Sequence, residues 1–132
     1  PLCVLLLDID HFKKVNDRLG HQVGDQVLTA VAHCIEEQVR SLDRVGRNGG
    51  EEFLVLLPDT ELEEAAEVAE RVRIAVSRLV IEGVPEDHPI HVSIGCAEYR
   101  AEDDNLGELI RRADEAMYAA KLAGRNRVVK AA

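Results

Sequence analysis

The chain has 132 residues and a formal net charge of −9 at pH 7, which excludes nucleic-acid binding through a basic surface. With 46% apolar and 31% charged residues it has the composition of a soluble globular protein. No apolar run is long enough to cross a bilayer, and the apolar start lacks the basic residues of a signal peptide. Its three cysteines are too few and too widely spaced for a disulfide framework or metal site. We expect one cytoplasmic domain over residues 1–132, without contact to nucleic acid or membrane.

The first predicted element is a buried strand over residues 2–7, which form an unbroken apolar run. The strand leads into Asp8-Ile9-Asp10, where a period of two places both aspartates on one face. Open α/β sheets bind ligands at the carboxyl ends of their strands, so Asp8 is a candidate functional acid. Asp10 has a simpler alternative role, the capping of the helix that follows.

Helical and strand-like patterns alternate along the rest of the chain. The predicted elements are, in order, helices over 11–19 and 23–39, strands at 43–45 and 53–57, a helix from 60 to about 80, a strand at 90–97, a helix over 106–123 and a strand at 127–129. Thr60-Glu61-Leu62-Glu63 resembles a capping box at the start of the third helix. This order predicts an α/β fold, an α+β sandwich in which a five-stranded mixed central sheet is flanked by helices on both faces.

The most unusual stretch is Arg47-Asn48-Gly49-Gly50-Glu51-Glu52-Phe53, which separates two strand-like runs. Asn48-Gly49 predicts a type I′ hairpin turn, in which both central residues have positive φ. Gly50 has no side chain, so a phosphate or base can approach the backbone closely. Glu51 and Glu52 begin the return strand on alternate faces, and carboxylates at such a turn suit Mg²⁺. A plain surface hairpin with solvated acids is the alternative interpretation.

Several of these stretches belong to one set of motifs. They are Asp8–Asp17, Gly20-His21 with Gly24-Asp25, Gly49–Phe53, Val92–Gly95 and Ala120–Arg127. Together they resemble the GGDEF domain of bacterial diguanylate cyclases over nearly the whole chain. The resemblance implies a fold like that of nucleotidyl cyclases and polymerase palms, and condensation of two GTP molecules into cyclic di-GMP with release of pyrophosphate. Asn48 departs from the family's usual residue, and we expect the domain to lack the family's helix before the first strand.

The resemblance also assigns chemistry to acids and cations. Asp8, the carbonyl of Ile9, Glu51 and Glu52 correspond to ligands of Mg²⁺ or Mn²⁺, and Glu51, Glu52 and Lys13 to the catalytic set. The positions that correspond to substrate contacts are Phe12, Lys13, Asn16, His21, Asp25, Arg47, Gly49, Gly50, Lys121 and Arg125. Asn16 and Asp25 would read guanine, whose adjacent N1–H and N2–H donors a carboxylate can accept, and adenine has no such pair. The basic members would surround the triphosphate, although Lys121 and Arg125 at a helix end also complement the helix dipole.

A second candidate site is regulatory. Arg40-Ser41-Leu42-Asp43 lies five residues before Gly49, at the spacing of the family's product-inhibition site. Arginine can bond guanine O6 and N7 in a bidentate manner, while an aspartate accepts from the other edge. Arg71 on the third predicted helix corresponds to a secondary arginine for the same ligand. An ordinary ion pair at a helix end is the alternative.

The resemblance implies partners as well. Each domain holds one GTP, so activity requires a homodimer, and the family usually carries an attached sensory or receiver domain within a parent protein that is sometimes attached to a membrane. A different function is also open, that of a non-catalytic receptor for cyclic di-GMP or GTP, against which the intact acids argue. A mixed cyclic dinucleotide as product is disfavoured by Asp25.

Overall fold

The computed structural model describes all 132 residues and confirms the predicted five-stranded mixed sheet. Its elements are β1 (Leu2–Ile9), α1 (Phe12–Leu19), α2 (His21–Gln38), β2 (Arg44–Arg47), β3 (Glu52–Pro58), α3 (Leu62–Ser77), β4 (Val92–Glu98), α4 (Leu106–Leu122) and β5 (Arg127–Lys130). The strand order is β2-β3-β1-β4-β5. The central strand β1 is antiparallel to both neighbours, and β5 is parallel to β4. No helix is both long and apolar enough to be a candidate membrane span.

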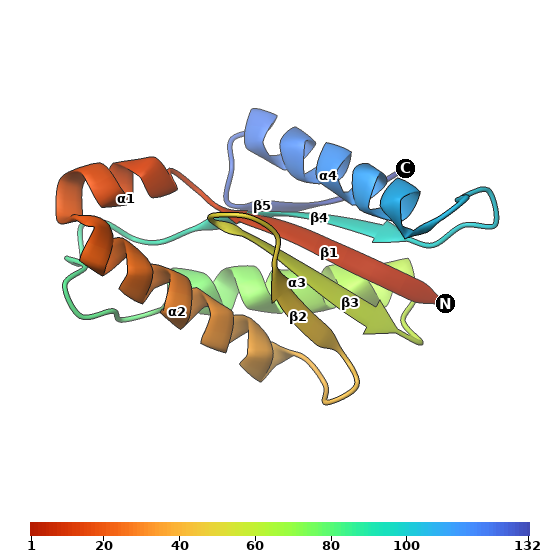
Figure 1. Cartoon of the computed structure of the whole chain (residues 1–132), viewed down its shortest axis with the longest axis horizontal. Coiled ribbons are helices and arrows are strands. Elements are labelled where there is room, and N and C mark those ends of the chain that lie inside the picture. The colour runs from red at the N-terminus through yellow and green to blue at the C-terminus, as the bar shows by residue number, and fades with distance from the viewer.

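Helices cover both faces of the sheet. In Figure 1, α4 lies over one face, α2 and α3 lie over the other, and α1 lies beyond the carboxyl end of β1. Alternate residues of β1 therefore enter different cores: Leu5 and Leu7 belong to a 22-residue cluster with α2 and α3, whereas Val4 and Leu6 pack with α4. Burial on both faces explains why this strand has a continuous apolar sequence.

Gly95 of β4 allows α4 to lie unusually close to the sheet. A Cβ at this position would be 2.1 Å from the carbonyl oxygen of Ala113 and 2.4 Å from the amide nitrogen of Met117. Both atoms belong to the α4 backbone, which cannot move aside as a flexible side chain could. The glycine thus fixes the height of α4 above the sheet, and with it the position of the helix end that carries Lys121.

The hairpin prediction is partly wrong. Gly49 has a φ of 100°, but Asn48 is not in the positive-φ region, so the turn is not type I′. The amide of Asn48 donates to the carbonyl of Glu52 at 2.8 Å, which leaves a three-residue loop over 49–51. Such loops need one left-handed residue rather than two. Strand β3 begins at Glu52, so Glu51 belongs to the loop and not to the strand.

The capping box also lies one residue later than predicted. Glu61 is the N-cap of α3, and its amide donates to the Glu64 carboxylate at 3.4 Å in a reciprocal capping box. Thr60 instead donates its hydroxyl to the carbonyl of Pro58 at 2.8 Å. The predicted boundaries of the other elements differ from the observed ones by a few residues, as helix ends fray and extended flanks pair.

Candidate active site

Three segments that are distant in sequence meet at the carboxyl end of β1. They are this strand end, the β2–β3 loop and the α4–β5 connection (Figure 1). Asp8 is the direct cross-strand neighbour of Glu52, and the amide of Ile9 donates to the carbonyl of Glu51 at 3.2 Å. Lys121, 113 positions along the chain, donates its ammonium to the Asp8 carboxylate. Five predicted site residues, Asp8, Ile9, Glu51, Glu52 and Lys121, are therefore assembled at one place.

The acids at this strand end repel one another. Burial raises the pKa of Asp8, the charges of Glu51 and Asp10 raise it further, and Lys121 opposes this shift. Burial also raises the pKa of Glu52, as do the charges of Asp8 and Asp114. Carboxyl groups whose ionisation is opposed by burial and like charge are stabilised by a nearby cation, and they are typical of functional sites.

The donor chemistry fits a divalent cation. Carboxylates of Asp8, Glu51 and Glu52, together with the Ile9 carbonyl, are the hard oxygen ligands that Mg²⁺ and Mn²⁺ prefer. In the structure no three Asp, Glu, His or Cys side chains are grouped closely enough to hold an ion. The positive charge beside Asp8 is instead the ammonium of Lys121. The site therefore fits a metal ion by its negative charge and oxygen ligands, and the side chains do not form a complete coordination shell.

The predicted guanine-reading residues lie where α1 meets α2. Gly20, with a φ of 90°, reverses the chain between the two helices. A Cβ on Gly24 would lie 1.9 Å from Oδ1 of Asn16 and 3.4 Å from the ring of Phe12, so only glycine fits this corner as it stands. Asp25 follows directly and lines an open hollow of about 410 Å³ together with Arg47.

The predicted substrate-contacting cations are distributed between the acid cluster at the end of β1 and the corner where α1 meets α2. Arg47 donates to the carbonyl of Gly50 at 2.6 Å and so crosses the loop beside Gly49. Lys13 is exposed in the first turn of α1, and His21 is exposed at the start of α2. Arg125 directly precedes Asn126, whose amide donates to Asp10 at 3.0 Å, and this places Arg125 beside the start of α1. Burial lowers the pKa of His11 there, and the charges of Lys14 and Arg125 lower it further.

Asp10 also belongs to this region, and the structure excludes the alternative that it caps the following helix. His11 is the N-cap of α1, in a left-handed conformation, and no side chain caps the helix. Asp10 accepts a hydrogen bond from the Ser93 hydroxyl at 2.6 Å and another from the Asn126 amide at 3.0 Å. Ser93 and Asn126 both lie within the motifs, but sequence alone gives no sign that they meet at Asp10.

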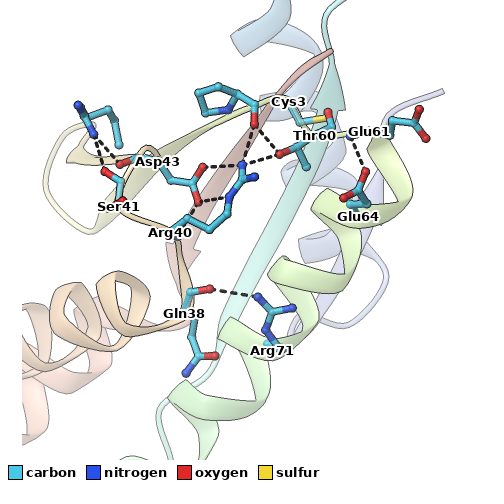
Figure 2. A network of polar contacts seen from close by, with 11 residues as sticks. Cys3, Gln38, Arg40, Ser41, Asp43, Thr60, Glu61, Glu64 and Arg71 are labelled. Carbon is cyan, nitrogen blue, oxygen red and sulfur yellow. Dashed lines mark hydrogen bonds and ion pairs between the residues drawn. The ribbon is translucent and has the colours of Figure 1, made fainter.

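The predicted regulatory residues form a second pocket at the opposite end of β3. Figure 2 shows the guanidinium of Arg40 bound to the Asp43 carboxylate through two hydrogen bonds, Nη2 to Oδ1 at 2.9 Å and Nε to Oδ2 at 3.2 Å. Arg40 also donates to the carbonyl of Pro58 and the hydroxyl of Thr60, at 2.7 and 2.9 Å. The Asp43 side chain is only 2% exposed whereas that of Arg40 is 49% exposed, so this is not an ordinary surface ion pair.

Arg71 of α3 faces the same pocket. It donates to the carbonyl of Gln38 at 3.1 Å (Figure 2). The pocket has a volume of about 160 Å³ and is lined by Arg40, Asp43 and Arg71, with Thr60 among the further residues. The three predicted residues are therefore brought together, and Thr60 is a polar partner that sequence reasoning missed.

The family model described as "Diguanylate cyclase, GGDEF domain" matches residues 1–127. The chain belongs to the GGDEF family. This GGDEF domain is 47% identical over 131 residues to "Probable diguanylate cyclase DgcT" of Escherichia coli K12. The alignment covers 98% of the domain and 29% of DgcT, so the chain spans about three tenths of that relative.

Solved structures agree with this assignment. The GGDEF domain superposes on the active GGEEF domain of a diguanylate cyclase from Vibrio cholerae with a TM-score of 0.93 and 33% identity, over 99% of this chain and 83% of that one. It superposes on the GGDEF domain of DgcB from Caulobacter crescentus, in complex with c-di-GMP, with a TM-score of 0.91 and 38% identity, over 98% and 77% of the two chains. The expected nucleotidyl cyclase palm-like fold is confirmed.

Proposed function

We propose that this GGDEF domain is a diguanylate cyclase, which condenses two GTP molecules into cyclic di-GMP and releases pyrophosphate. The observation that carries the proposal is the juxtaposition of Asp8, Glu52 and Lys121, which places paired acids and a cation at one strand end. A surface hairpin needs neither a buried carboxyl group that faces a second, half-buried one nor a lysine held against the buried one. The identity to DgcT, a probable diguanylate cyclase by name, supports the same activity.

Recognition of GTP is assigned to the α1–α2 corner and the surrounding cations. Asp25 accepts the N1–H and N2–H donors of guanine, and Asn16 adds a further polar contact to the base. Lys13, Lys121 and Arg125 neutralise the triphosphate, since charge-assisted bonds to phosphate are roughly twice as strong as neutral ones. Phe12, His21 and Arg47 border the nucleotide, and Gly49 and Gly50 leave space beside it.

The reaction is two successive in-line displacements. The ribose 3′-oxygen of one GTP attacks the α-phosphorus of the other, a P–O bond forms, and the bond to the bridging oxygen of the β-phosphate breaks. Glu52, whose pKa is raised by burial and by Asp8, accepts the hydroxyl proton more readily than an ordinary carboxylate. Lys13, Lys121 and Arg125 stabilise the charge on departing pyrophosphate. Asp8, the Ile9 carbonyl, Glu51 and Glu52 would hold a divalent cation, which would supply Lewis-acid stabilisation of this charge.

Two copies of the domain are needed because one copy holds one GTP. The second displacement closes the ring only when the two nucleotides face each other in opposite directions, which a two-fold homodimer provides. In the parent protein an attached sensory or receiver domain would arrange this pairing.

Product inhibition is assigned to the pocket of Arg40, Asp43 and Arg71. Its guanidinium groups can donate to guanine O6 and N7, and a buried carboxylate can accept from the opposite edge of the base. The supporting observation is that all three side chains line one pocket, away from the acids of the active site. The c-di-GMP complex of the related DgcB domain is consistent with such a ligand.

The test is GTP turnover by the dimeric protein in the presence of Mg²⁺, with products separated by chromatography. We expect cyclic di-GMP from the wild type and a loss of at least about 100-fold in Glu51→Gln, as for removal of a group that stabilises the transition state. Glu102→Gln, which changes an exposed acid elsewhere, should leave the rate unchanged. Absence of cyclic dinucleotide, together with cyclic di-GMP binding that depends on Arg40 and no binding of GTP, would instead identify a receptor.

A further inference from the structure

The connection between α4 and β5 has an unusual backbone. Gly124, Arg125 and Asn126 have φ values of 125°, 65° and 46°, three consecutive residues in the left-handed region. Glycine adopts this region freely, whereas for arginine it is unfavourable and for asparagine it is tolerated. A turn of this kind persists only where its surroundings hold it in place. Its central residue is Arg125, one of the proposed triphosphate contacts.

The turn is held by hydrogen bonds to Asn126 from two parts of the fold, at the backbone amide and at the side chain. Its amide donates to Oδ2 of Asp10 at 3.0 Å, and Oδ1 of Asp10 accepts from the Ser93 hydroxyl at 2.6 Å. Its side-chain oxygen accepts from Nη1 of Arg73 on α3 at 3.0 Å, and Glu70 holds this arginine in place at 2.9 Å. Asp10 and Ser93 are 9% and 0% exposed, so the hydrogen bond between them is shielded from water.

We propose that Asp10 is a positioning residue for substrate binding, which acts through Ser93 and the Asn126 amide to hold the 124–126 turn so that Arg125 faces the triphosphate of GTP. The proposal rests on the proposed function and deepens it. Each carboxylate oxygen of Asp10 already accepts a hydrogen bond from the protein. Asp10 therefore has a structural role and is not one of the proposed metal ligands. A buried carboxylate without such a role would oppose folding.

The strand end thereby anchors the end of α4 at two points. Lys121 donates to Asp8, and the Asn126 amide donates to Asp10. The two acids are two residues apart, at the end of β1 and just beyond it, and their donors are five residues apart on the other segment. Arg125 lies between these anchors. The spacing of Asp8 and Asp10 thus sets the positions of Lys121 and Arg125 relative to the acids, which explains how a strained turn can hold an arginine in one place.

Three variants separate this role from simple stabilisation. Asp10→Asn keeps the shape of the side chain but leaves one acceptor oxygen for two donors. Ser93→Ala releases one oxygen while Asp10 keeps its charge beside Asp8. The matched control is Asp103→Asn, because Asp103 is also buried, at 8% exposed, and also accepts from a backbone amide, that of Arg100 at 2.8 Å, but lies far from the nucleotide.

The experiment is calorimetric titration with a non-hydrolysable GTP analogue and with GMP, in Mg²⁺, after thermal melting has shown that each variant is folded. We expect Asp10→Asn to weaken the analogue about tenfold, the effect of one lost charged hydrogen bond, and GMP less than twofold. Ser93→Ala should act in the same direction more weakly, and Asp103→Asn should change neither affinity. In an Arg125→Ala background, Asp10→Asn should cause no further loss, because the two residues act through one contact.

Equal weakening of analogue and GMP by Asp10→Asn, or independent losses in the double variant, would overturn the proposal. If Arg125→Ala weakens the analogue and Asp10→Asn does not, this inference fails while the proposed function stands. If wild-type protein binds the analogue no more tightly than GMP, the triphosphate site itself is wrong, and the proposed function fails with the inference.

Discussion

Asp8 and Glu52 face each other across neighbouring antiparallel strands, and burial raises the pKa of both carboxyl groups. Like charges directly opposite each other in a sheet are destabilising. The sheet therefore retains a pair that folding alone disfavours, at the strand end to which the proposed cyclase activity assigns a divalent cation. Residues that destabilise the fold locally are expected at functional sites.

The repulsion between Asp8 and Glu52 should make the stability of the folded domain depend on pH. The pKa of Glu52 is raised above its ordinary value of 4.5 in the folded state, so ionisation of Glu52 opposes folding. The penalty is absent below the ordinary value and complete above the raised one. Glu52→Gln should therefore melt a few degrees above the wild type at neutral pH, and at the same temperature as the wild type in acid, while cyclase activity falls.

The control for this prediction is Glu102→Gln, at an exposed acid, whose melting temperature should follow that of the wild type at every pH. A lower melting temperature for Glu52→Gln than for the wild type at neutral pH would contradict the interpretation of Asp8 and Glu52 as a repelling pair.

Gly24→Ala should impair GTP binding without unfolding the protein. The new methyl group would meet Oδ1 of Asn16 at 1.9 Å, and the amide must turn away because its side chain is the movable partner. We expect the KM for GTP to rise about tenfold, the effect of one lost hydrogen bond to the base, as measured in a turnover assay. Gly46→Ala, where no atom lies within 4 Å of the added Cβ, should behave as wild type, and an unchanged KM in Gly24→Ala would exclude Asn16 as a guanine contact.

Gly95→Ala should destabilise the whole domain. Its Cβ would lie 2.1 Å from a backbone oxygen of α4, so the helix must shift away from the sheet. Overpacking of this kind costs roughly 3 kcal/mol of unfolding free energy, which denaturant titration can measure against Gly46→Ala. A loss below about 0.5 kcal/mol, the usual range for surface substitutions, would show that α4 can move freely.

Arg40→Lys should separate charge from geometry in the second pocket. Lysine can still neutralise buried Asp43, but it cannot make the bidentate hydrogen bonds to this carboxylate that Figure 2 shows. We expect the affinity for cyclic di-GMP to fall at least about tenfold while the protein stays folded, and product inhibition to weaken in parallel. Arg111→Lys, at a paired and exposed arginine of α4, is the matched control. Retained product affinity in Arg40→Lys would place the inhibitory site elsewhere.

Much of the fold was predictable because local patterns and tertiary structure agree. The apolar run of β1, the helical stripes and the glycines at helix ends all belong to elements that the structure contains. The hairpin turn type was not predictable, because Asn48-Gly49 favours a two-residue turn while strand pairing through Glu52 produces a longer loop. Pairing depends on residues far from the turn, which local propensity does not record.

The candidate site likewise has features that could be predicted from the sequence and features that could not. Asp8 and Glu52 could be predicted as acids at strand ends, but their direct pairing depends on the register of β1 with β3. The role of Asp10 was hidden because its partners, Ser93 and Asn126, lie 83 and 116 positions away. Sequence spacing alone cannot distinguish a helix cap from a long-range anchor, since both need an acid at the same place.

The most direct test of the active-site assignment is a crystal structure with a non-hydrolysable GTP analogue and Mn²⁺, whose anomalous signal locates the ion. We expect the ion within bonding distance of Asp8 and Glu51, with Lys121 turned from Asp8 toward the phosphates and guanine against Asn16 and Asp25. An ion bound away from both acids, or a nucleotide seated elsewhere, would contradict the assignment.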